Sequence, residues 1–268
     1  MRKGGAGSAP PFSMPHLVVE NLTKIYERGK IRALSNVSFS VEKGEFLVLI
    51  GLSGSGKSTL LRCINRLVEP TSGRIFLNGV ELTKLSPRAM RRMRRKIGMV
   101  FQQFNLVKRA TVLQNVLAGR LGYNPTIPTL LGRFPKEDIR RAQVCLERVG
   151  LLDKMYVRAD QLSGGQQQRV GIARALMQEP ELLLADEPVS ALDPATSHSV
   201  MQYIEQINKE DGVTVIASLH FLSLARRYGQ RIIALKAGEK VFDGKPGEID
   251  DRKFKEIYGE EAEEVEVR

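Results

Sequence analysis

"GLSGSGKST", residues 51–59, follows the apolar stretch "EFLVLI" and opens a predicted helix, "STLLRCINRL". The glycines let the backbone curl so that its N–H groups converge on phosphate oxygens, with the positive end of the helix dipole behind them. A strand, a glycine-rich loop and a helix in this order form the context that a phosphate loop requires. The stretch therefore predicts an α/β fold that binds a nucleotide.

Side chains of the same loop can bind a triphosphate and its metal ion. Lys57 would bring a positive charge to the β- and γ-phosphates, and the Ser58 hydroxyl would hold Mg²⁺. A plain glycine turn between a strand and a helix is the alternative interpretation. The residues of this loop that we assign to the nucleotide are Gly51, Ser53, Gly54, Ser55, Gly56, Lys57, Ser58 and Thr59.

A second motif, "ELLLADEP" at residues 181–188, is an apolar strand that ends in two carboxylates. In open α/β folds, ligands collect at the carboxyl edge of the sheet, where such a strand delivers its last residues. Asp186 is expected to bind Mg²⁺ through water, and Glu187 to orient and polarise the attacking water as general base. A helix N-cap pair ahead of Pro188 is the alternative, which the phosphate loop upstream weakens.

The rest of the chain divides into a strand-rich N-terminal third, a helical segment over about residues 111–178, and alternating strands and helices after it. This order predicts a mostly parallel sheet covered on both faces, with a helical subdomain. Within the helical segment, "PKEDIRRAQVCLERVGL" spaces apolar residues along one predicted face. These residues are Ile139, Ala142, Val144, Leu146 and Val149.

The composition suits a globular α/β protein. The 268 residues are 42% hydrophobic and 26% charged. The longest apolar run has about seven residues, whereas a helix that spans a bilayer needs roughly 20, so any role at a membrane is expected to be peripheral. Residues 1–14 lack the apolar centre of a signal peptide and are expected to form a disordered leader. Cys63 and Cys145 lack metal-ligand spacing and are expected to be reduced thiols.

The net charge of +11 is unevenly distributed. Residues 249–268 hold eight acids against four bases and are expected to form an acidic C-terminal tail. The densest basic run, Lys84 to Lys96, has seven bases and no acid. It is interpreted as a solvated helical face, with contact to lipid or to a partner as the alternative. No aromatic residue interrupts it to stack on bases, which disfavours nucleic acid.

Five features now occur together: "GLSGSGKST", "LSGGQ" at 162–166, "LLLADEP", "SALD" at 190–193, and a lone histidine, His220, at a strand end. In order and spacing they resemble the ATP-binding-cassette (ABC) ATPases, over about Leu17 to Gly244. The resemblance implies a P-loop NTPase domain of the ABC type over residues 15–248. It also implies an N-terminal antiparallel β-subdomain and an inserted α-helical subdomain over about residues 104–178.

The same resemblance implies roles for residues outside the phosphate loop. Tyr26 would stack on adenine, and Gln102 would touch Mg²⁺ and the attacking water while linking the core to the helical subdomain. Asp193 would lie in a loop that crosses a dimer seam. His220 would contact the γ-phosphate and hold Glu187 in place, so that the implied catalytic residues are Glu187, His220 and Lys57.

The "LSGGQ" stretch has no side chain suited to bond chemistry. Ser163 can cap the helix that follows and offer a hydroxyl, while Gly164 and Gly165 let backbone N–H groups approach a phosphate closely. In ABC ATPases this surface, with Gln166 after the glycines, faces the phosphate loop of a second copy. Because one chain carries one of each motif, we expect an ATP-dependent head-to-tail homodimer.

Finer resemblance points to an importer. Soluble translation and DNA-repair cassettes do not fit this length, and the membrane helices fused to many exporters are absent. "FQQFNLVKRATVLQNVLAGRLGYNPTIPTLLGRFPKEDIRRA" and "SLHFLSLARRYGQRIIALKAGEKVFDG" resemble the phosphonate-importer ATPases, including the phosphite and hypophosphite systems. The segment Gly122 to Pro135 is longer than the corresponding segment that we expect in amino-acid importer ATPases. One departure is that Leu222 or Ser223 stands where many importers carry an acidic residue after the histidine.

This resemblance implies a subunit that works with MgATP, a second copy of itself and transmembrane permease subunits. An extracytoplasmic binding protein would be an indirect partner, nucleic acid would not be one, and the location would be peripheral, at the cytoplasmic face of the cell membrane. The alternatives are an importer ATPase for another small solute, such as an amino acid, and an ATP-driven switch that binds nucleic acid.

Overall fold

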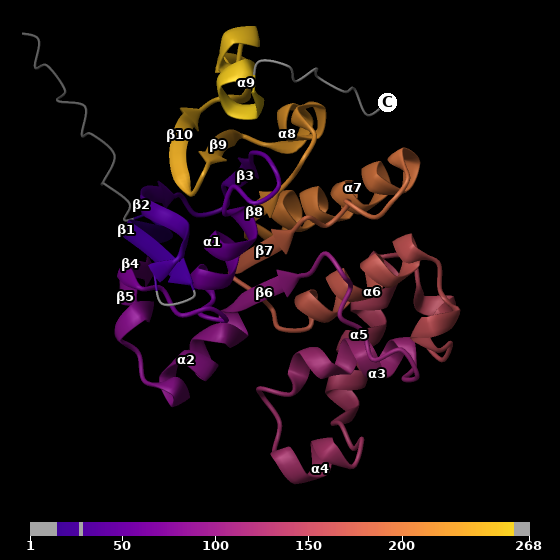
Figure 1. Cartoon of the computed structure of the whole chain (residues 1–268). Coiled ribbons are helices and arrows are strands. Elements are labelled where there is room, and N and C mark those ends of the chain that lie inside the picture. Colours follow the sequence, from indigo (N-terminus) through magenta and orange to yellow (C-terminus); the bar gives the residue numbers. More distant parts are fainter. Residues whose placement is uncertain (1–14, 27–28, 260–268) are drawn as a thin grey trace, which may run out of the picture.

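The computed structural model describes residues 15–26 and 29–259, which form two sheets with helices packed around them (Figure 1). An antiparallel sheet has the order β2-β1-β4-β5 and a larger sheet the order β10-β9-β3-β8-β7-β6. The strands are β1 Leu17–Tyr26, β2 Ile31–Val41, β3 Phe46–Ile50, β4 Ser72–Leu77, β5 Val80–Glu81, β6 Ile97–Val100, β7 Leu182–Asp186, β8 Thr214–Ser218, β9 Arg231–Lys236 and β10 Glu239–Gly244.

Helices cover both faces of the larger sheet. The α-helices are α1 Lys57–Ile64, α2 Pro87–Met93, α3 Val112–Leu117, α4 Thr126–Leu130, α5 Lys136–Arg148, α6 Gly164–Leu176, α7 Pro194–Asp211, α8 Leu222–Tyr228 and α9 Asp251–Tyr258. Short 3₁₀ helices are η2 Leu82–Lys84, η3 Arg94–Lys96, η4 Ala118–Arg120, η5 Leu152–Lys154, η6 Ala159–Gln161 and η7 Pro246–Glu248.

The central strands are apolar on both faces because both faces are covered. In β3, Phe46, Val48 and Ile50 pack into one hydrophobic cluster with α6, α7 and α8. Leu47 and Leu49 point the other way, into a second cluster that contains α1 and the antiparallel sheet. Five strands run parallel to one another, in the order β9, β3, β8, β7 and β6, and β10 is antiparallel to β9. The mostly parallel sheet and the antiparallel β-subdomain predicted from the sequence are confirmed.

The helical subdomain comprises α3 to α6 and lies away from the antiparallel sheet, at the lower right of Figure 1. Helix α5 buries Ala142 and Leu146 inside this subdomain, and Val149, just past the helix, is also buried. The prediction that Val144 shares this face is wrong, because Val144 is 55% exposed. It lies two residues from both Ala142 and Leu146, a spacing that places a helical side chain on the opposite side.

The segment Gly122 to Pro135 contains α4 and is anchored at its base. The Tyr123 hydroxyl donates to the carbonyl oxygen of Gln178 at 2.7 Å, and the Asn124 amide donates to Asp138 at 2.6 Å. Farther along, Ile127 is 76% exposed. The insertion is therefore tied to the end of α6 and to α5, while its far part faces solvent.

Part of the basic run has structural partners. The Arg94 guanidinium donates to the carbonyl oxygens of Asn65 and Arg66 at 2.9 and 2.6 Å. Lys96 pairs with Glu181 at 2.8 Å. The arginines of α2, which are Arg88, Arg91 and Arg92, are exposed, as expected for a solvated helical face.

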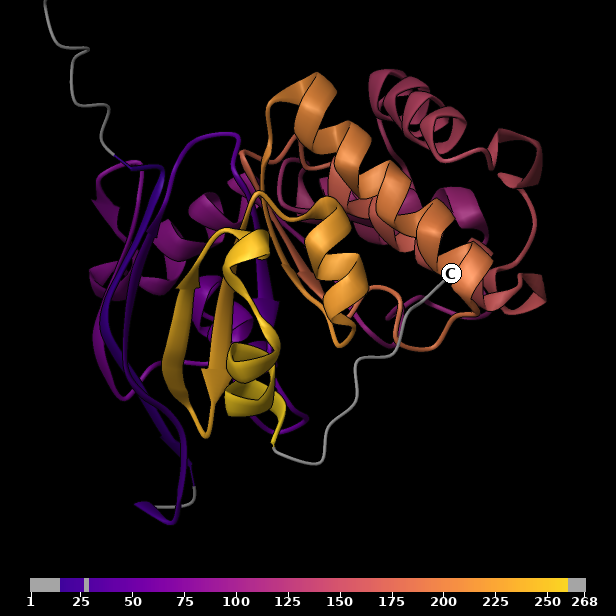
Figure 2. The same ribbon diagram turned by 90° about the horizontal axis from the view of Figure 1, so that it is seen from above.

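The beginning of the predicted acidic tail packs on the core. Ile249, Phe254 and Ile257 are buried, and α9 lies beside β9 in both views (Figure 2). Residues 260–268, which hold five of the eight acids, and the predicted leader, residues 1–14, lie outside the described residues.

Both cysteines are free thiols, as predicted. Burial raises the pKa of Cys63 to about 12 and that of Cys145 to about 11. Among the described residues, no helix has the length and apolar character needed to cross a membrane.

A buried histidine joins the two sheets. His16 is 2% exposed, and its Nδ1 lies 2.6 Å from the hydroxyl of Thr214, which also accepts the Gly44 N–H at 2.9 Å. We assign the neutral ring, with Nδ1 accepting from Thr214, and Nε2 has no partner among the described residues. Burial lowers the pKa of His16, an effect that Glu181 opposes and Lys43 and Lys96 reinforce.

This histidine predicts a pH dependence of stability. Because its folded-state pKa lies below the unfolded value of 6.5, the unfolded chain binds more protons between the two values. The stabilisation is complete above pH 6.5 and is lost as the pH falls from 6.5 to the folded-state pKa. In His16→Asn, the free energy of unfolding should depend less on pH in this window. The measurement is a series of denaturant titrations at different pH values. His198→Asn is the control, and an unchanged slope in His16→Asn would contradict the assignment.

Candidate nucleotide site

The phosphate loop joins β3 to α1 and depends on its glycines. Gly51, Gly54 and Gly56 have φ values of 138°, 79° and 107°, in the left-handed region that favours glycine. A Cβ on Gly51 would lie 2.2 Å from the Leu235 carbonyl oxygen, and one on Gly56 would lie 2.5 Å from that of Ala33. The loop is thus pressed against neighbouring backbone, and its curled shape is fixed by packing as well as by sequence.

Lys57 lies inside this loop. Lys57 is only 3% exposed, and its ammonium donates to the carbonyl oxygens of Gly51 and Leu52 at 2.7 and 3.1 Å. Burial lowers the pKa of Lys57, an effect that the carboxylates of Glu187 and Asp186 oppose. The hydroxyl of Ser55 is buried without a hydrogen-bond partner among the described residues. A buried cation and an unpaired hydroxyl in one glycine-rich cradle fit a phosphate group.

Asp186, the last residue of β7, is fully buried and connects three elements. Its Oδ1 accepts the Ser58 hydroxyl of α1 at 2.7 Å and lies 3.3 Å from the Ser218 hydroxyl of β8. Its Oδ2 accepts from the Arg62 guanidinium at 3.2 Å. Two of the three predicted Mg²⁺ ligands, Ser58 and Asp186, are therefore brought together.

The donor set fits magnesium better than a transition metal. The described residues contain no group of three or more His, Cys, Asp or Glu side chains that could hold a metal ion. Mg²⁺ usually binds through one or two protein oxygens together with substrate phosphates and water. A hydroxyl and a carboxylate beside a phosphate cradle match that requirement.

Glu187 and His220 form a pair at the carboxyl ends of β7 and β8. His220 Nε2 lies 2.7 Å from Glu187 Oε1, and the two side chains are 34% and 12% exposed. The Glu187 N–H donates to the Ser218 hydroxyl at 2.9 Å, and its φ is 48°, a strained value for this residue type. A carboxylate that is fixed at its backbone and at its side chain, yet still partly exposed, can act as a general base.

Gln102 and Tyr26 lie at the ends of other strands. Gln102 is exposed just after β6, and the left-handed residue Phe104 follows it. Arg174 of α6 donates to the Phe104 carbonyl oxygen at 2.9 Å, which connects this loop to the helical subdomain. Tyr26 ends β1, and its ring centroid lies 4.8 Å from the Lys24 ammonium.

The "LSGGQ" stretch lies in the helical subdomain, apart from the phosphate loop (Figure 1). Ser163 caps α6, as predicted: its hydroxyl accepts the Gln166 N–H at 3.4 Å, and the Gln166 side chain accepts the Ser163 N–H at 3.1 Å. Ser163, Gly165 and Gln166 line a cavity of about 310 Å³ together with Thr196 of α7.

Asp193 lies beside this cavity as the N-cap of α7. Its carboxylate accepts the Thr196 N–H at 3.0 Å, and hydrogen bonds from Thr196 hold its pKa below the ordinary value. An exposed aspartate that remains ionised can contact a second chain. Within one chain, therefore, the phosphate loop and the "LSGGQ" surface are separate.

The sequence pattern of ABC transporters matches residues 34–190. The chain belongs to the ABC transporter family. The ABC family predicted from the five motifs is confirmed, and the chain is an ATP-binding ATPase of that family.

Curated relatives of this ABC protein carry a more specific name. The phosphonates import ATP-binding protein PhnC of Bacillus thuringiensis is 55% identical over 247 residues, covering 92% of this chain and 96% of its own. The Staphylococcus aureus protein of the same name is 54% identical over 253 residues, covering 94% and 98%. The finer resemblance to phosphonate-importer ATPases is thereby confirmed.

Solved ABC cassettes share the fold. The dimeric cassette MJ0796 is 40% identical with a TM-score of 0.77, covering 86% of this chain and 98% of its own. The cassette MJ1267 is 30% identical with a TM-score of 0.79, covering 91% and 99%. CbiO1 of Clostridium perfringens, part of the transporter complex cbiONQ, is 30% identical with a TM-score of 0.77, covering 90% and 92%.

Two residues of this ABC site were not found from the sequence. Arg62 follows Ser58 by four residues on α1, so both lie on one helix face and reach Asp186. Ser218 is aligned with Asp186 between β7 and β8. Helical spacing would have indicated Arg62, whereas Ser218 depends on a strand register that the sequence does not show.

The two glycines of "LSGGQ" give a matched pair of variants. A Cβ on Gly165 would lie 2.2 Å from the Thr196 methyl, whereas one on Gly164 would lie 3.4 Å from Leu192. We expect Gly165→Ala to push α6 away from α7 and to lower the free energy of unfolding by about 1–3 kcal/mol. Gly164→Ala should stay within about 0.5 kcal/mol of the parent protein. Equal stabilities in denaturant titrations would show that this α6–α7 contact is not tight.

Proposed function

We propose that this chain is the ATP-hydrolysing subunit of an importer for phosphonate or a related phosphorus oxyanion, such as phosphite or hypophosphite. The catalytic part of this proposal rests on the 2.7 Å contact between His220 and Glu187, next to the buried Asp186 and the phosphate loop. The phosphonate part rests on the named relatives, which are 54–55% identical over nearly their whole length.

ATP would be bound first through its phosphates. The N–H groups of residues 51–59 and the Lys57 ammonium would contact the β- and γ-phosphates, and the Tyr26 ring would stack on adenine. Ser58, Asp186 and Gln102 would hold Mg²⁺, whose charge would neutralise the phosphate oxygens.

Hydrolysis would then use the fixed pair at the strand ends. Glu187 would accept a proton from a water molecule whose oxygen attacks the γ-phosphorus. The bond from that phosphorus to the β–γ bridging oxygen breaks, and ADP and phosphate are formed. His220 would keep the Glu187 carboxylate aimed at the water and contact the γ-phosphate.

The second half-site would come from another copy of the chain. Ser163, Gly164, Gly165 and Gln166 would bind the γ-phosphate held by the partner's phosphate loop, with Asp193 at the seam. Support comes from the solved cassette MJ0796, which is dimeric. The separation of the two half-sites within one chain also requires a partner for a closed site.

Glu187→Gln tests this arrangement. The amide keeps the size of the carboxylate but cannot accept the proton, so ATP turnover should fall at least about a hundredfold. Dimers should then persist in MgATP, measured by light scattering during gel filtration. The double variant Lys57→Ala, Glu187→Gln is the control and should remain monomeric. A Glu187→Gln protein that stays monomeric in MgATP would count against the head-to-tail dimer.

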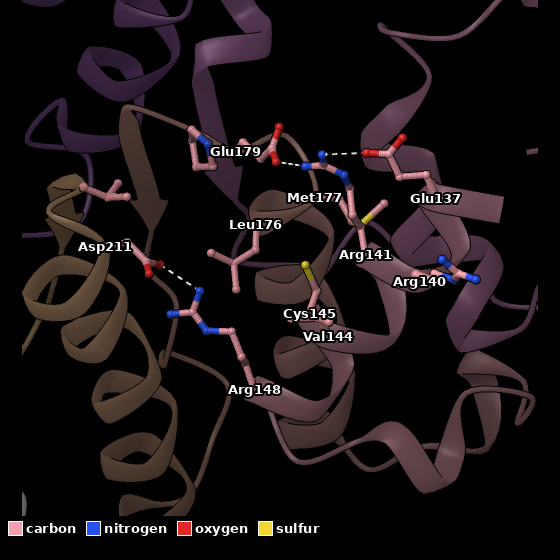
Figure 3. Close-up of a pocket in the computed structure, with 12 residues that line it drawn as sticks. Glu137, Arg140, Arg141, Val144, Cys145, Arg148, Leu176, Met177, Glu179 and Asp211 are labelled. Atoms are coloured by element: carbon pink, nitrogen blue, oxygen red, sulfur yellow. Dashed lines mark hydrogen bonds and ion pairs between the residues drawn. The ribbon is translucent and has the colours of Figure 1, made fainter. Parts of the chain in front are cut away.

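A cavity of about 620 Å³ between the helical subdomain and the core is the proposed permease site (Figure 3). Leu176, Met177 and Val144 provide apolar lining. Arg148 of α5 reaches across it to Asp211 of α7 at 2.8 Å, and this pair is drawn in the figure.

The position of this cavity suits a coupling surface. A permease segment seated there would contact α5 of the helical subdomain and the ends of α6 and α7. Movement between the subdomain and the core would therefore be transmitted to the permease. Since the substrate does not touch this subunit, the permease and an extracytoplasmic binding protein would select it, and the subunit would be peripheral at the cytoplasmic face.

Val144→Asp tests this surface. The added charge in the cavity should reduce permease-stimulated ATP hydrolysis and transport at least tenfold in the reconstituted complex, while ATP hydrolysis by the isolated subunit stays unchanged. Val80→Asp, at an exposed valine of β5, is the matched control and should affect neither rate. Unaltered transport in Val144→Asp would exclude this cavity as the docking site.

The substrate class is tested with the same complex. ATP hydrolysis and uptake should respond to phosphonate or phosphite with its binding protein, and not to an amino acid. A response to amino acids alone would exclude the phosphonate class. Salt-dependent stimulation by DNA would instead favour the nucleic-acid switch, although Arg94 and Lys96 of the basic run are engaged within the fold.

A further inference from the structure

The loop that carries His220 lies between β8 and α8. The Leu219 N–H donates to the Leu49 carbonyl oxygen at 2.9 Å, which fixes the beginning of the loop to β3. The ring of His220 contacts Glu187 through Nε2 at 2.7 Å. The carbonyl oxygen of His220 accepts the hydroxyl of Tyr258 at 3.3 Å. The backbone of the histidine is thus tied to the C-terminal helix.

Helix α9 is firmly attached where it makes this contact. Ile257 is 1% exposed, and the ring of Tyr258 packs on that of Phe254 with centroids 4.8 Å apart. At the beginning of α9, Arg226 of α8 donates to the Ile249 carbonyl oxygen at 2.9 Å. Lys236 of β9 also donates to the backbone of α9, at Glu256. The helix is therefore anchored at both of its ends, and Tyr258 extends from a rigid base.

We propose that Tyr258 is a positioning residue for ATP hydrolysis, which acts through the backbone of His220 and so sets the aim of the Glu187 carboxylate. This inference rests on the catalytic roles proposed above for His220 and Glu187. It assigns to helix α9 a part in the rate of hydrolysis.

The physical reason is that contacts run in series from the Tyr258 hydroxyl through the backbone and ring of His220 to the Glu187 carboxylate. A hydrogen bond at the carbonyl oxygen restricts rotation of the peptide that carries the imidazole, and the imidazole in turn holds the carboxylate. A general base loses efficiency when its orientation is no longer fixed, because the reactive arrangement becomes one of several. Substrate binding through the phosphate loop does not depend on this linkage.

Tyr258→Phe in the full-length chain removes the hydroxyl and keeps the ring that packs on Phe254. We expect kcat for ATP to fall about fivefold, as for the loss of one neutral hydrogen bond, with KM unchanged. The control is Tyr228→Phe in α8, whose hydroxyl contacts His198 rather than His220. That variant should hydrolyse ATP at the parent rate.

A double-variant cycle distinguishes positioning from a general structural effect. In single-turnover reactions, Tyr258→Phe should slow the parent protein but add nothing to His220→Ala, because both changes act on one linkage. A wild-type rate in Tyr258→Phe, or an equal slowing in the His220→Ala background, would overturn the inference and leave the roles of His220 and Glu187 intact. A wild-type rate in His220→Ala would refute the proposed catalytic pair itself, and the inference with it.

Discussion

The fully buried carboxylate of Asp186 is the constraint on which the arrangement of the site depends. A buried charge is costly unless hydrogen bonds satisfy it. Here the bonds come from Ser58 and Arg62 of α1 and from Ser218 of β8. The same carboxylate therefore fixes the helix that follows the phosphate loop against β7 and β8, the two strands that precede Glu187 and His220. The phosphate loop and the pair of Glu187 and His220 are brought together by one group that the core must satisfy in any case.

The sequence predicted the parts of this site that are encoded locally. A phosphate loop is specified by glycines within a few residues, and the structure places Gly51 and Gly56 where a side chain would collide with backbone. The capping of α6 by Ser163 is equally local, since both of its bonds are to Gln166. The alternation of strands and helices was sufficient for the parallel sheet because buried parallel strands need continuous apolar runs.

The remaining features depend on tertiary packing. Val144 was placed on the wrong face of α5 because apolar character alone did not reveal that it borders a cavity. Ser218 and Tyr258 reach the site through strand register and through the return of the chain end to the core, neither of which leaves a motif. The distance from Tyr258 to His220 along the sequence is 38 residues, so only the folded structure shows that the two residues meet.

The ammonium of Lys57, held by the carbonyl oxygens of Gly51 and Leu52, affects how a nucleotide would be received. A glycine-rich loop left to itself would sample many shapes and would lose that freedom each time a phosphate arrived. With its own cation inside, the loop loses this conformational entropy once, when the chain folds. An incoming phosphate would then meet a preorganised cradle and would exchange one set of contacts to Lys57 for another.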